Sequence, residues 1–450
     1  MSTVALRMDS PGRVDPKASP AWRRLIDRLY ALSTMGMSLG LERVDRVLAA
    51  LDRPEHRFPS VHIAGSNGKG STAAFLATIL AESGRRVGLY TSPHLVSLTE
   101  RVQILQRGVA PAALSEEALL EAFEAVESVA PSFGDLSFFE AITAAGMWAF
   151  AQRGIEVAVV EAGLGARLDA TRLVRAEVSV LTELALEHTA ILGDTLEAIA
   201  REKLAVIRPG RPLIAADSAP PVSAVIDAAA AAANAPLSLI NRDLFVRRLG
   251  AGSFDLDLGD LQVDQARLPL LGPHQGRNAL LAASAAVHFD PRISADTIRR
   301  GLAKTRWPGR MEIVRSTSPR IVLDGAHNAQ GTAALIAGIE AHPAEIPHPI
   351  HLVFGVLGDK DAGAMIGPLA RLARTIILTR ADSPRARSAE DLLPLLPAET
   401  RARASCEASL PAALARAEAR AAAEGGTIVV AGSLYLVGEA RALLSPGSLL

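Results

Sequence analysis

A glycine-rich turn between an apolar run and an alanine-rich helical pattern constrains this chain more than any other segment. The run from Val61 to Ala64 leads into the loop Gly65-Ser66-Asn67-Gly68-Lys69-Gly70-Ser71-Thr72, and a helical pattern continues to Glu82. Backbone N–H groups in such a loop point at an anion, the helix N-terminus adds partial positive charge and Lys69 adds a full one. Ser71 or Thr72 is placed to ligate Mg²⁺ on a nucleotide. The segment predicts a nucleoside triphosphate site; a glycine-rich turn without nucleotide is the alternative.

Length and charge limit the remaining possibilities. A chain of 450 residues is too long for one ordinary core, so two domains are expected. The 47 basic and 48 acidic residues leave a formal net charge of −1, which gives no support to nucleic-acid or membrane-surface binding. Cys406 is the single cysteine, and it favours a reducing compartment. Without an 18-residue apolar span or a signal peptide, we expect a cytoplasmic protein.

Short β-branched runs alternate with helical patterns, which is typical of parallel α/β layers. Expected strands in the first part are 61–64, 86–90, 157–161, 178–182 and 212–215, with helices at 115–129, 138–152 and 195–207. Residues 244–270 alternate apolar and polar residues and predict a small antiparallel patch. A second α/β run has strands at 321–323, 351–354, 375–378 and 427–430, with helices at 328–342 and 410–424. We therefore expect a flexible N-terminal extension at 1–20, a P-loop domain at 21–304 and a smaller domain at 305–450.

Chemistry-bearing side chains follow several of these strands. Glu161 ends a buried strand, where a magnesium-binding acid is expected beside a P-loop, although a solvated acid is the alternative. Arg167 and Asp169 follow in a turn and are candidates for orienting a substrate. His188 follows the next strand and is a candidate metal ligand, although a loop histidine is more often simply exposed. Lys203 by itself reads as a solvated helix charge.

Three further clusters occupy junctions later in the chain. His274, Gln275 and Asn278 begin a helix, where they can cap it or touch a base or phosphate. Pro308-Gly309-Arg310 precedes Asp324-Gly325-Ala326-His327-Asn328, which is another strand-to-helix junction. Asp359-Lys360-Asp361 follows a strand, and by itself this segment is more often a charged surface turn.

Together these motifs resemble the folylpolyglutamate synthase family, including its bifunctional dihydrofolate synthase forms, within the Mur ligase superfamily. The resemblance extends from about Tyr30 to about Val437. The matching blocks are Gly65–Ser71, Tyr90–Leu95, Glu100-Arg101, Phe138–Glu140, Glu161–Thr171, His188–Gly193, Ile199–Lys203, His274–Asn278, Pro308–Arg310, Asp324–Asn328 and Asp359–Asp361. Gly70 and the Ser92-Pro93-His94 block favour the folate branch, because peptidoglycan Mur ligases usually carry threonine after the lysine.

The resemblance implies an ATP-binding Mur-ligase-like domain and a Rossmann-like C-terminal domain with the active site between them. It implies nucleotide contacts from Gly65, Asn67, Gly68, Lys69, Gly70, Ser71, Thr72, Asn278, Arg310 and Asp324. Two Mg²⁺ ions are implied, with Ser71 and Glu161 at one and Glu161, His188 and a carbamylated Lys203 at the other. The implied catalytic residues are Lys69, Lys203, His188 and His327. The implied substrate contacts are Thr91, Ser92, Pro93, His94 and Leu95, to which the turn adds Arg167 and Asp169.

The implied reaction joins L-glutamate to the carboxylate of a folate, of dihydropteroate or of both, through an acyl phosphate. Ala166, Arg172 and Glu187 depart from the family's usual glycine, asparagine and aspartate, which leaves the preferred pterin substrate open. The alternatives are a Mur-type ligase that adds an amino acid to a cell-wall nucleotide and a P-loop NTPase without ligation. A monomer that binds only small molecules is expected.

Overall fold

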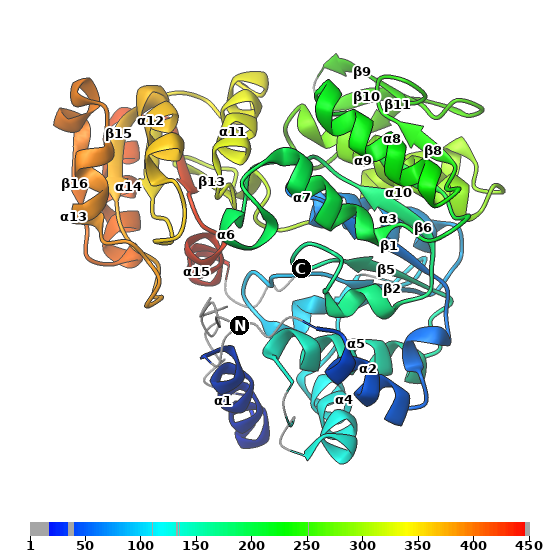
Figure 1. The fold of residues 1–450 in the computed structure, drawn as a ribbon. Helices are drawn as coiled ribbons and strands as arrows, with labels where there is room; N and C mark the ends of the chain where they lie inside the picture. The colour runs from blue at the N-terminus through cyan, green and yellow to red at the C-terminus, as the bar shows by residue number, and fades with distance from the viewer. Residues whose placement is uncertain are drawn as a thin grey trace.

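A mostly parallel sheet of eight strands forms the first body, on the right in Figure 1. The computed structural model describes residues 18–34, 40–109, 111–131, 134, 136–250 and 252–445, so most of the expected 1–20 extension lies outside the described residues. The strand order is β4-β3-β2-β5-β1-β6-β7-β8. The bounds are β1 Ser60–Ala64, β2 Val87–Tyr90, β3 Val102–Leu105, β4 Ala112–Ala113, β5 Val157–Glu161, β6 Ala176–Leu181, β7 Leu213–Ala215 and β8 Leu237–Leu239. The strands β3 and β4 are antiparallel to their neighbours.

Helices cover both faces of this sheet. The helices are α1 Pro20–Thr34, α2 Glu42–Ala50, α3 Lys69–Glu82, α4 Glu116–Val129, α5 Phe138–Gln152, α6 Thr189–Leu192, α7 Leu196–Lys203, α8 Pro220–Ala232, α9 His274–Phe289 and α10 Ala295–Lys304. One core joins α3, α9 and α10 to Val61, Val159 and Val180. On the opposite face, α1, α2, α4 and α5 pack over β2 and β5, and α7 and α8 pack over β6 and β7. Because both faces are buried, the central strands are mostly apolar, although β1 carries the buried Ser60 and His62.

A small antiparallel sheet and a second α/β body complete the fold. The small sheet has the order β11-β10-β9, with β9 Phe245–Gly250, β10 Ser253–Asp257 and β11 Gln262–Arg267, which confirms the antiparallel patch. The second sheet has the order β12-β13-β17-β14-β15-β16. Its elements are β12 Glu312–Arg315, β13 Arg320–Asp324, α11 Ala329–Ala341, β14 Ile350–Phe354, α12 Ala362–Leu372, β15 Ala373–Leu378, α13 Ala389–Leu392, β16 Ala404–Cys406, α14 Leu410–Glu424, β17 Thr427–Ala431 and α15 Leu434–Leu444. These elements occupy the left side of Figure 1.

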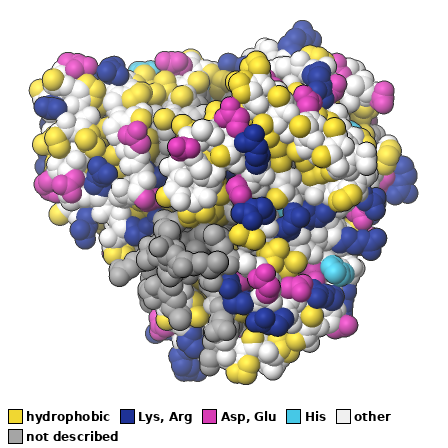
Figure 2. Space-filling model, in the orientation of Figure 1, with side chains coloured by type: hydrophobic (Ala, Val, Ile, Leu, Met, Phe, Trp, Pro, Cys, Tyr) yellow, Lys and Arg dark blue, Asp and Glu magenta, His cyan; other side chains and the backbone are white. Residues whose placement is uncertain are grey.

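The expected strands are present with small shifts at their ends, and the expected α/β class is confirmed. The helix expected over 195–207 ends at Lys203 and continues as a 3₁₀ turn, Leu204–Val206. Residue 305 falls between the end of α10 and the start of β12. On the face shown in Figure 2, acidic and basic side chains are interspersed. In the described part of the chain, no helix is both long and apolar enough to span a membrane.

Candidate active site

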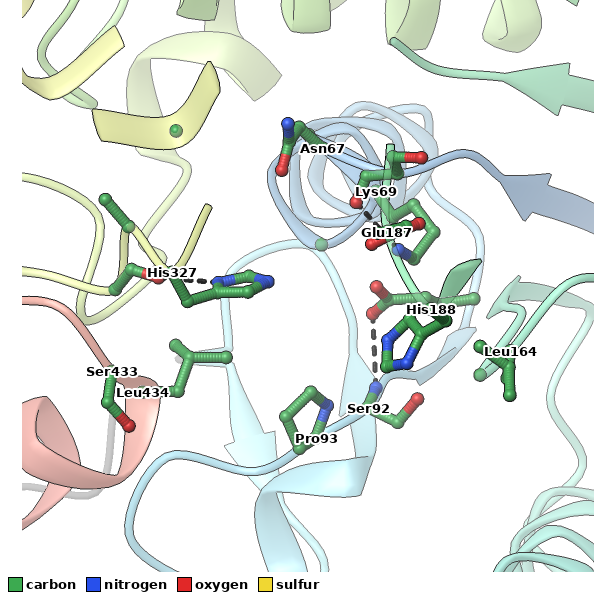
Figure 3. A pocket seen from close by; sticks show the side chains of 18 of the residues that line it. Asn67, Lys69, Ser92, Pro93, Leu164, Glu187, His188, His327, Ser433 and Leu434 are labelled. Carbon is green, nitrogen blue, oxygen red and sulfur yellow. Dashed lines mark hydrogen bonds between the residues drawn. The ribbon is translucent and has the colours of Figure 1, made fainter. Parts of the chain in front are cut away.

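A cavity of about 330 Å³ lies where the two bodies meet. Its walls come from the carboxyl ends of β1, β5, β6 and β13 and from the N-terminal ends of α3, α9 and α15. Lys69, Glu187 and His188 lie on one side of it, and His327, Ser433 and Leu434 lie on the other (Figure 3). Ligands bind outside the carboxyl ends of the strands in open α/β sheets, which is where this cavity lies.

The glycine-rich loop turns directly into α3. Gly68 precedes the helix with φ +84°, in the left-handed region that glycine adopts without strain, and an added Cβ there would collide with Asn278 Oδ1. Lys69 Nζ donates to the carbonyl oxygens of Gly65 and Ser66, each at 3.0 Å, so the lysine folds back across the loop. Ser71 is buried and lines the cavity. The loop therefore presents backbone N–H groups, an ammonium and a hydroxyl to one space, as an anion site requires.

A carboxylate and the next loop meet at the end of β5. Glu161 Oε2 accepts a hydrogen bond from Ser92 N at 3.1 Å, and both residues line the cavity. Burial raises the pKa of Glu161, while the charge of Lys69 opposes that shift. The other oxygen, Oε1, accepts no hydrogen bond from the described residues. A buried carboxylate that faces a cation and keeps one oxygen available in this way is suited to a metal ligand.

Asp169 closes the turn that follows Glu161. Its Oδ2 accepts from Gly163 N at 3.0 Å and from Leu164 N at 2.8 Å, and its Oδ1 accepts from Thr171 N at 3.0 Å. Burial raises the pKa of Asp169, and these hydrogen bonds oppose that shift. Asp169 lines the cavity, but its oxygens are already committed to the turn.

The loop after β6 places an ion pair beside His188. Lys203 Nζ lies 2.9 Å from Glu187 Oε1 and donates to Gly65 O at 2.7 Å, so it also touches the glycine-rich loop. Burial lowers the pKa of Lys203 to about 8, although Glu187 opposes the shift. Burial raises the pKa of Glu187, but the charges of Lys203 and Lys69 outweigh burial and hold it well below its usual range. Desolvation by the surrounding protein and the charge of Lys360 lower the pKa of His188 to about 4, which keeps its ring neutral at pH 7.

The second body contributes Arg310, Asp324 and His327. Asp324 accepts from Met311 N and Ala326 N, each at 2.9 Å, and burial raises its pKa while Arg310 opposes the shift. His327 Nδ1 donates to Gly325 O at 2.9 Å, which leaves Nε2 as an acceptor. Burial lowers the pKa of His327 to about 4. This side of the cavity therefore offers a carboxylate, a guanidinium and a neutral imidazole.

Amide side chains join the two bodies across the cavity. Asn328 Nδ2 donates to Asn67 Oδ1 at 2.9 Å, and Asn67 Nδ2 donates to Gln330 Oε1 at 2.5 Å. Gln330 Nε2 donates to Glu183 Oε2 at 3.3 Å. Asn67 is predicted to contact nucleotide, and here its side chain reaches the second body instead of turning back into its own loop.

Some predicted site residues lie outside the cavity lining. Arg167 is exposed, and its Nε lies 2.9 Å from Glu202 Oε1. His94 Nδ1 accepts from Arg101 Nε at 3.0 Å. The other residues outside the lining are Gly65, Thr72, Thr91, Leu95 and Lys203. The roles of these seven residues stay predictions, because a residue that supports a loop of the site need not itself contact the ligand.

The cavity also contains residues to which sequence reasoning assigned no role. Lys360 and Arg385 both reach Asp359, at 3.4 Å and 3.1 Å, so two cations share one carboxylate. Arg101 is buried with its guanidinium 5.1 Å from the Phe138 ring centre. The Asp359-Lys360-Asp361 segment alone looked like a surface turn, and only the position of the second body brings it to the cavity.

The three departures from the family pattern have identifiable environments. Ala166 is fully buried in the core beneath α7. Arg172 turns away from the cavity, since its Nη1 donates to Ala205 O. Glu187 takes part in the Lys203 ion pair, so the longer arm still reaches the lysine.

The donor atoms present fit magnesium bound together with a nucleotide. Within the described ranges, no three His, Cys, Asp or Glu side chains form a ready metal cluster. Ser71 and Glu161 supply a hydroxyl and a carboxylate, the oxygen donors that Mg²⁺ prefers, and phosphate oxygens complete such sites. Lys203 as an ammonium can only donate, so it fits a metal site only when carbamylation converts it to an oxygen ligand.

Comparison with known proteins agrees with a nucleotide site between two bodies. Residues 63–286 match the Mur ligase middle domain, and residues 309–434 match the Mur ligase glutamate ligase domain. Folylpolyglutamate synthase from Lacticaseibacillus casei is 34% identical over 416 residues, which cover 90% of this chain and 94% of that protein. Dihydrofolate synthase/folylpolyglutamate synthase from Escherichia coli is 34% identical over 387 residues, with 85% and 86% covered.

A longer relative and several solved structures are also similar to this chain. A Haloferax volcanii protein described as a probable bifunctional folylpolyglutamate synthase/dihydropteroate synthase is 36% identical over 93% of this chain, but the match spans half of that protein's length. Mycobacterium tuberculosis folylpolyglutamate synthase complexed with ADP superposes with a TM-score of 0.85 at 29% identity, covering 94% of this chain and 98% of that one. E. coli FolC in complex with DHPP and ADP gives 0.82 at 32%, with 95% and 98% covered.

The fold and the site thus define a Mur ligase, an enzyme that uses ATP to form an amide bond. Within that class, the chain belongs to the folylpolyglutamate synthase and dihydrofolate synthase family.

Proposed function

We propose that this enzyme joins L-glutamate to the carboxylate of a folate, of dihydropteroate or of both, through an acyl phosphate. One observation carries the proposal: a single cavity holds the P-loop residues Lys69 and Ser71, the strand-end Glu161, and the second body's Asp324 and His327. The proposal is supported by the E. coli relative, whose structure holds ADP and DHPP.

The chemistry requires an anionic acceptor to attack an anionic phosphate. An acceptor carboxylate oxygen forms a bond to the γ-phosphorus as the bond to ADP breaks, and the glutamate nitrogen then attacks the acyl carbon. Phosphate leaves with the carbon–oxygen electron pair, and the nitrogen loses its proton. Lys69 offsets negative charge at the phosphates, and closure of the two bodies keeps water from the acyl phosphate. The neutral His327 Nε2 can accept a hydrogen bond from the incoming amine.

The magnesium sites follow from the donor set. Ser71 and Glu161 would hold one ion, and Glu161, His188 and a carbamylated Lys203 would hold the second. Bound Mg²⁺ would neutralise phosphate charge. The pKa of about 8 supports the Lys203 assignment, because only the neutral amine reacts with CO₂.

Lys360 and Arg385 suit the incoming glutamate. The amino acid carries two carboxylates, and within the described residues these two cavity-lining cations pair with one carboxylate, Asp359, which leaves net positive charge. Lys360 lines the same cavity as His188 and His327, and its charge contributes to the lowered pKa of both imidazoles. One chain supplies both walls of the cavity, and we propose that it acts as a monomer.

Labelled-glutamate incorporation tests the proposal. Purified enzyme with Mg-ATP is offered dihydropteroate and tetrahydrofolate separately, with phosphate release recorded in parallel. Incorporation with dihydropteroate alone would identify a dihydrofolate synthase. Incorporation with tetrahydrofolate alone would identify a synthase that extends glutamate tails, and incorporation with both acceptors would identify a bifunctional enzyme. ATP hydrolysis without glutamate incorporation into either acceptor would contradict the proposal, as would phosphate release that depends on a UDP-linked substrate.

A further inference from the structure

The segment that joins the two bodies, residues 305–311, contacts several elements of the nucleotide site. Arg310 lines the cavity. Gly309 O accepts from Gly325 N at 2.8 Å, and Met311 N donates to Asp324 Oδ2 at 2.9 Å. A Cβ added at Gly309 would lie 3.0 Å from Leu95 Cδ2. A displacement of this short segment would therefore move several site residues together.

Trp307, in the same segment, packs on the glycine-rich loop. Its indole is partly buried against the core of the first body. A Cβ added at Gly70 would lie 2.9 Å from Cζ2, 3.0 Å from Nε1 and 3.1 Å from Cε2 of this ring. Those three atoms are the nearest neighbours that such a Cβ would meet, so the indole edge occupies the space that a side chain would need.

Gly70 is therefore required for space and not for backbone conformation. It lies in the first turn of α3 and is not among the glycines with positive φ. Alanine fits a helix better than glycine, so a glycine at this position needs another cause. The indole supplies that cause, because it fills the space beside Gly70, which lies in the sequence between Lys69 and Ser71.

We propose that Trp307 is a positioning residue that docks the interbody segment onto the glycine-rich loop, so that nucleotide binding at the loop and the placement of Arg310 and Asp324 depend on one contact. The proposal rests on the proposed function for its ligand, an adenine nucleotide. Removal of the ring releases the segment, whereas addition of a methyl group at Gly70 pushes the ring and the segment away from the loop.

A double-mutant cycle on the full chain tests the contact. Gly70→Ala, Trp307→Leu and the double variant are compared by calorimetric titration with Mg-ADP. We expect Gly70→Ala to weaken ADP affinity at least tenfold in the parent and less than threefold in the Trp307→Leu background. An equal loss in both backgrounds would overturn the proposal, because the methyl group would then act on the phosphates directly.

Further variants separate positioning from stability. Trp307→Phe replaces the ring by a smaller one and serves if Trp307→Leu does not fold. Trp148→Phe is the matched control, since Trp148 packs in the opposite core, and it should leave ADP affinity within twofold. With Trp22 and Trp148 replaced by phenylalanine, ADP should change the emission of Trp307, and unchanged emission would contradict the proposal. Parent enzyme that binds ADP but fails to incorporate glutamate would refute the proposed function and leave this contact standing.

Discussion

Replacement of Asp169 by asparagine distinguishes a turn-holding carboxylate from a substrate contact. Each oxygen of this buried side chain accepts two hydrogen bonds, Oδ2 from Gly163 N and Leu164 N, and Oδ1 from the backbone N–H and hydroxyl of Thr171. Asparagine keeps one oxygen and turns an NH₂ group toward the other two donors. Each buried donor left unpaired costs about 1–3 kcal/mol, so the two unpaired donors of Asp169→Asn should lower the free energy of unfolding by about 2–6 kcal/mol.

Removal of the buried charge offsets part of this loss, so we expect a value toward the lower end of that range. Burial raises the pKa of Asp169, so a neutral side chain escapes part of a desolvation cost. Urea unfolding followed by circular dichroism measures the difference. Asp257→Asn is the matched control, because Asp257 accepts one backbone hydrogen bond from Gly259 N in an exposed turn, and we expect a change below about 0.5 kcal/mol. If Asp169→Asn unfolds like the parent and only raises the KM for the acceptor, the turn-holding role is refuted.

Three further predictions concern the cavity. With a pKa of about 8, the Lys203 amine is about one-fifth neutral at pH 7.4, against roughly 0.1% at the ordinary lysine pKa. Activity should therefore fall severalfold in CO₂-free buffer, return when bicarbonate is added, and decline as the pH falls below 8. Activity that changes in none of these three assays would contradict carbamylation. Lys360→Ala should raise the KM for glutamate about tenfold through loss of a charge-assisted contact, with the KM for ATP within twofold, while Lys304→Ala, whose lysine pairs with Glu82, changes neither. Asn67→Ala removes hydrogen bonds to Asn328 and Gln330 and should raise the KM for ATP about tenfold at unchanged melting temperature; normal kinetics would show that these bonds do not support closure.

Much of the fold followed from local patterns. Apolar runs between helical patterns predicted parallel strands, because only strands buried on both faces can be continuously apolar. The strands β3 and β4 were missed: both are short, they lie at one edge of the sheet, and β4 has only the two residues Ala112–Ala113. The 3₁₀ turn after Lys203 was also missed, since its apolar residues continue the helical pattern.

The site was predictable where a residue directly follows a strand. Glu161 and Asp324 end parallel strands, and the carboxyl ends of parallel strands share one edge of their sheet. Lys360, Arg385 and Gln330 were missed because their place in the cavity depends on how the second body docks. The substrate contact expected of Arg167 stays a prediction; nothing in the sequence indicated that α7 places Glu202 within reach of its guanidinium.

The most direct test of the proposed ligation is glutamate-dependent phosphate release by the parent enzyme and by Lys69→Ala, with dihydropteroate or tetrahydrofolate as acceptor. We predict one phosphate per glutamate incorporated by the parent, and no turnover by a Lys69→Ala protein whose circular dichroism and melting temperature match the parent. Full activity in that variant, or incorporation without ATP, would contradict the central claim that the loop at Gly65–Thr72 activates a carboxylate for ligation.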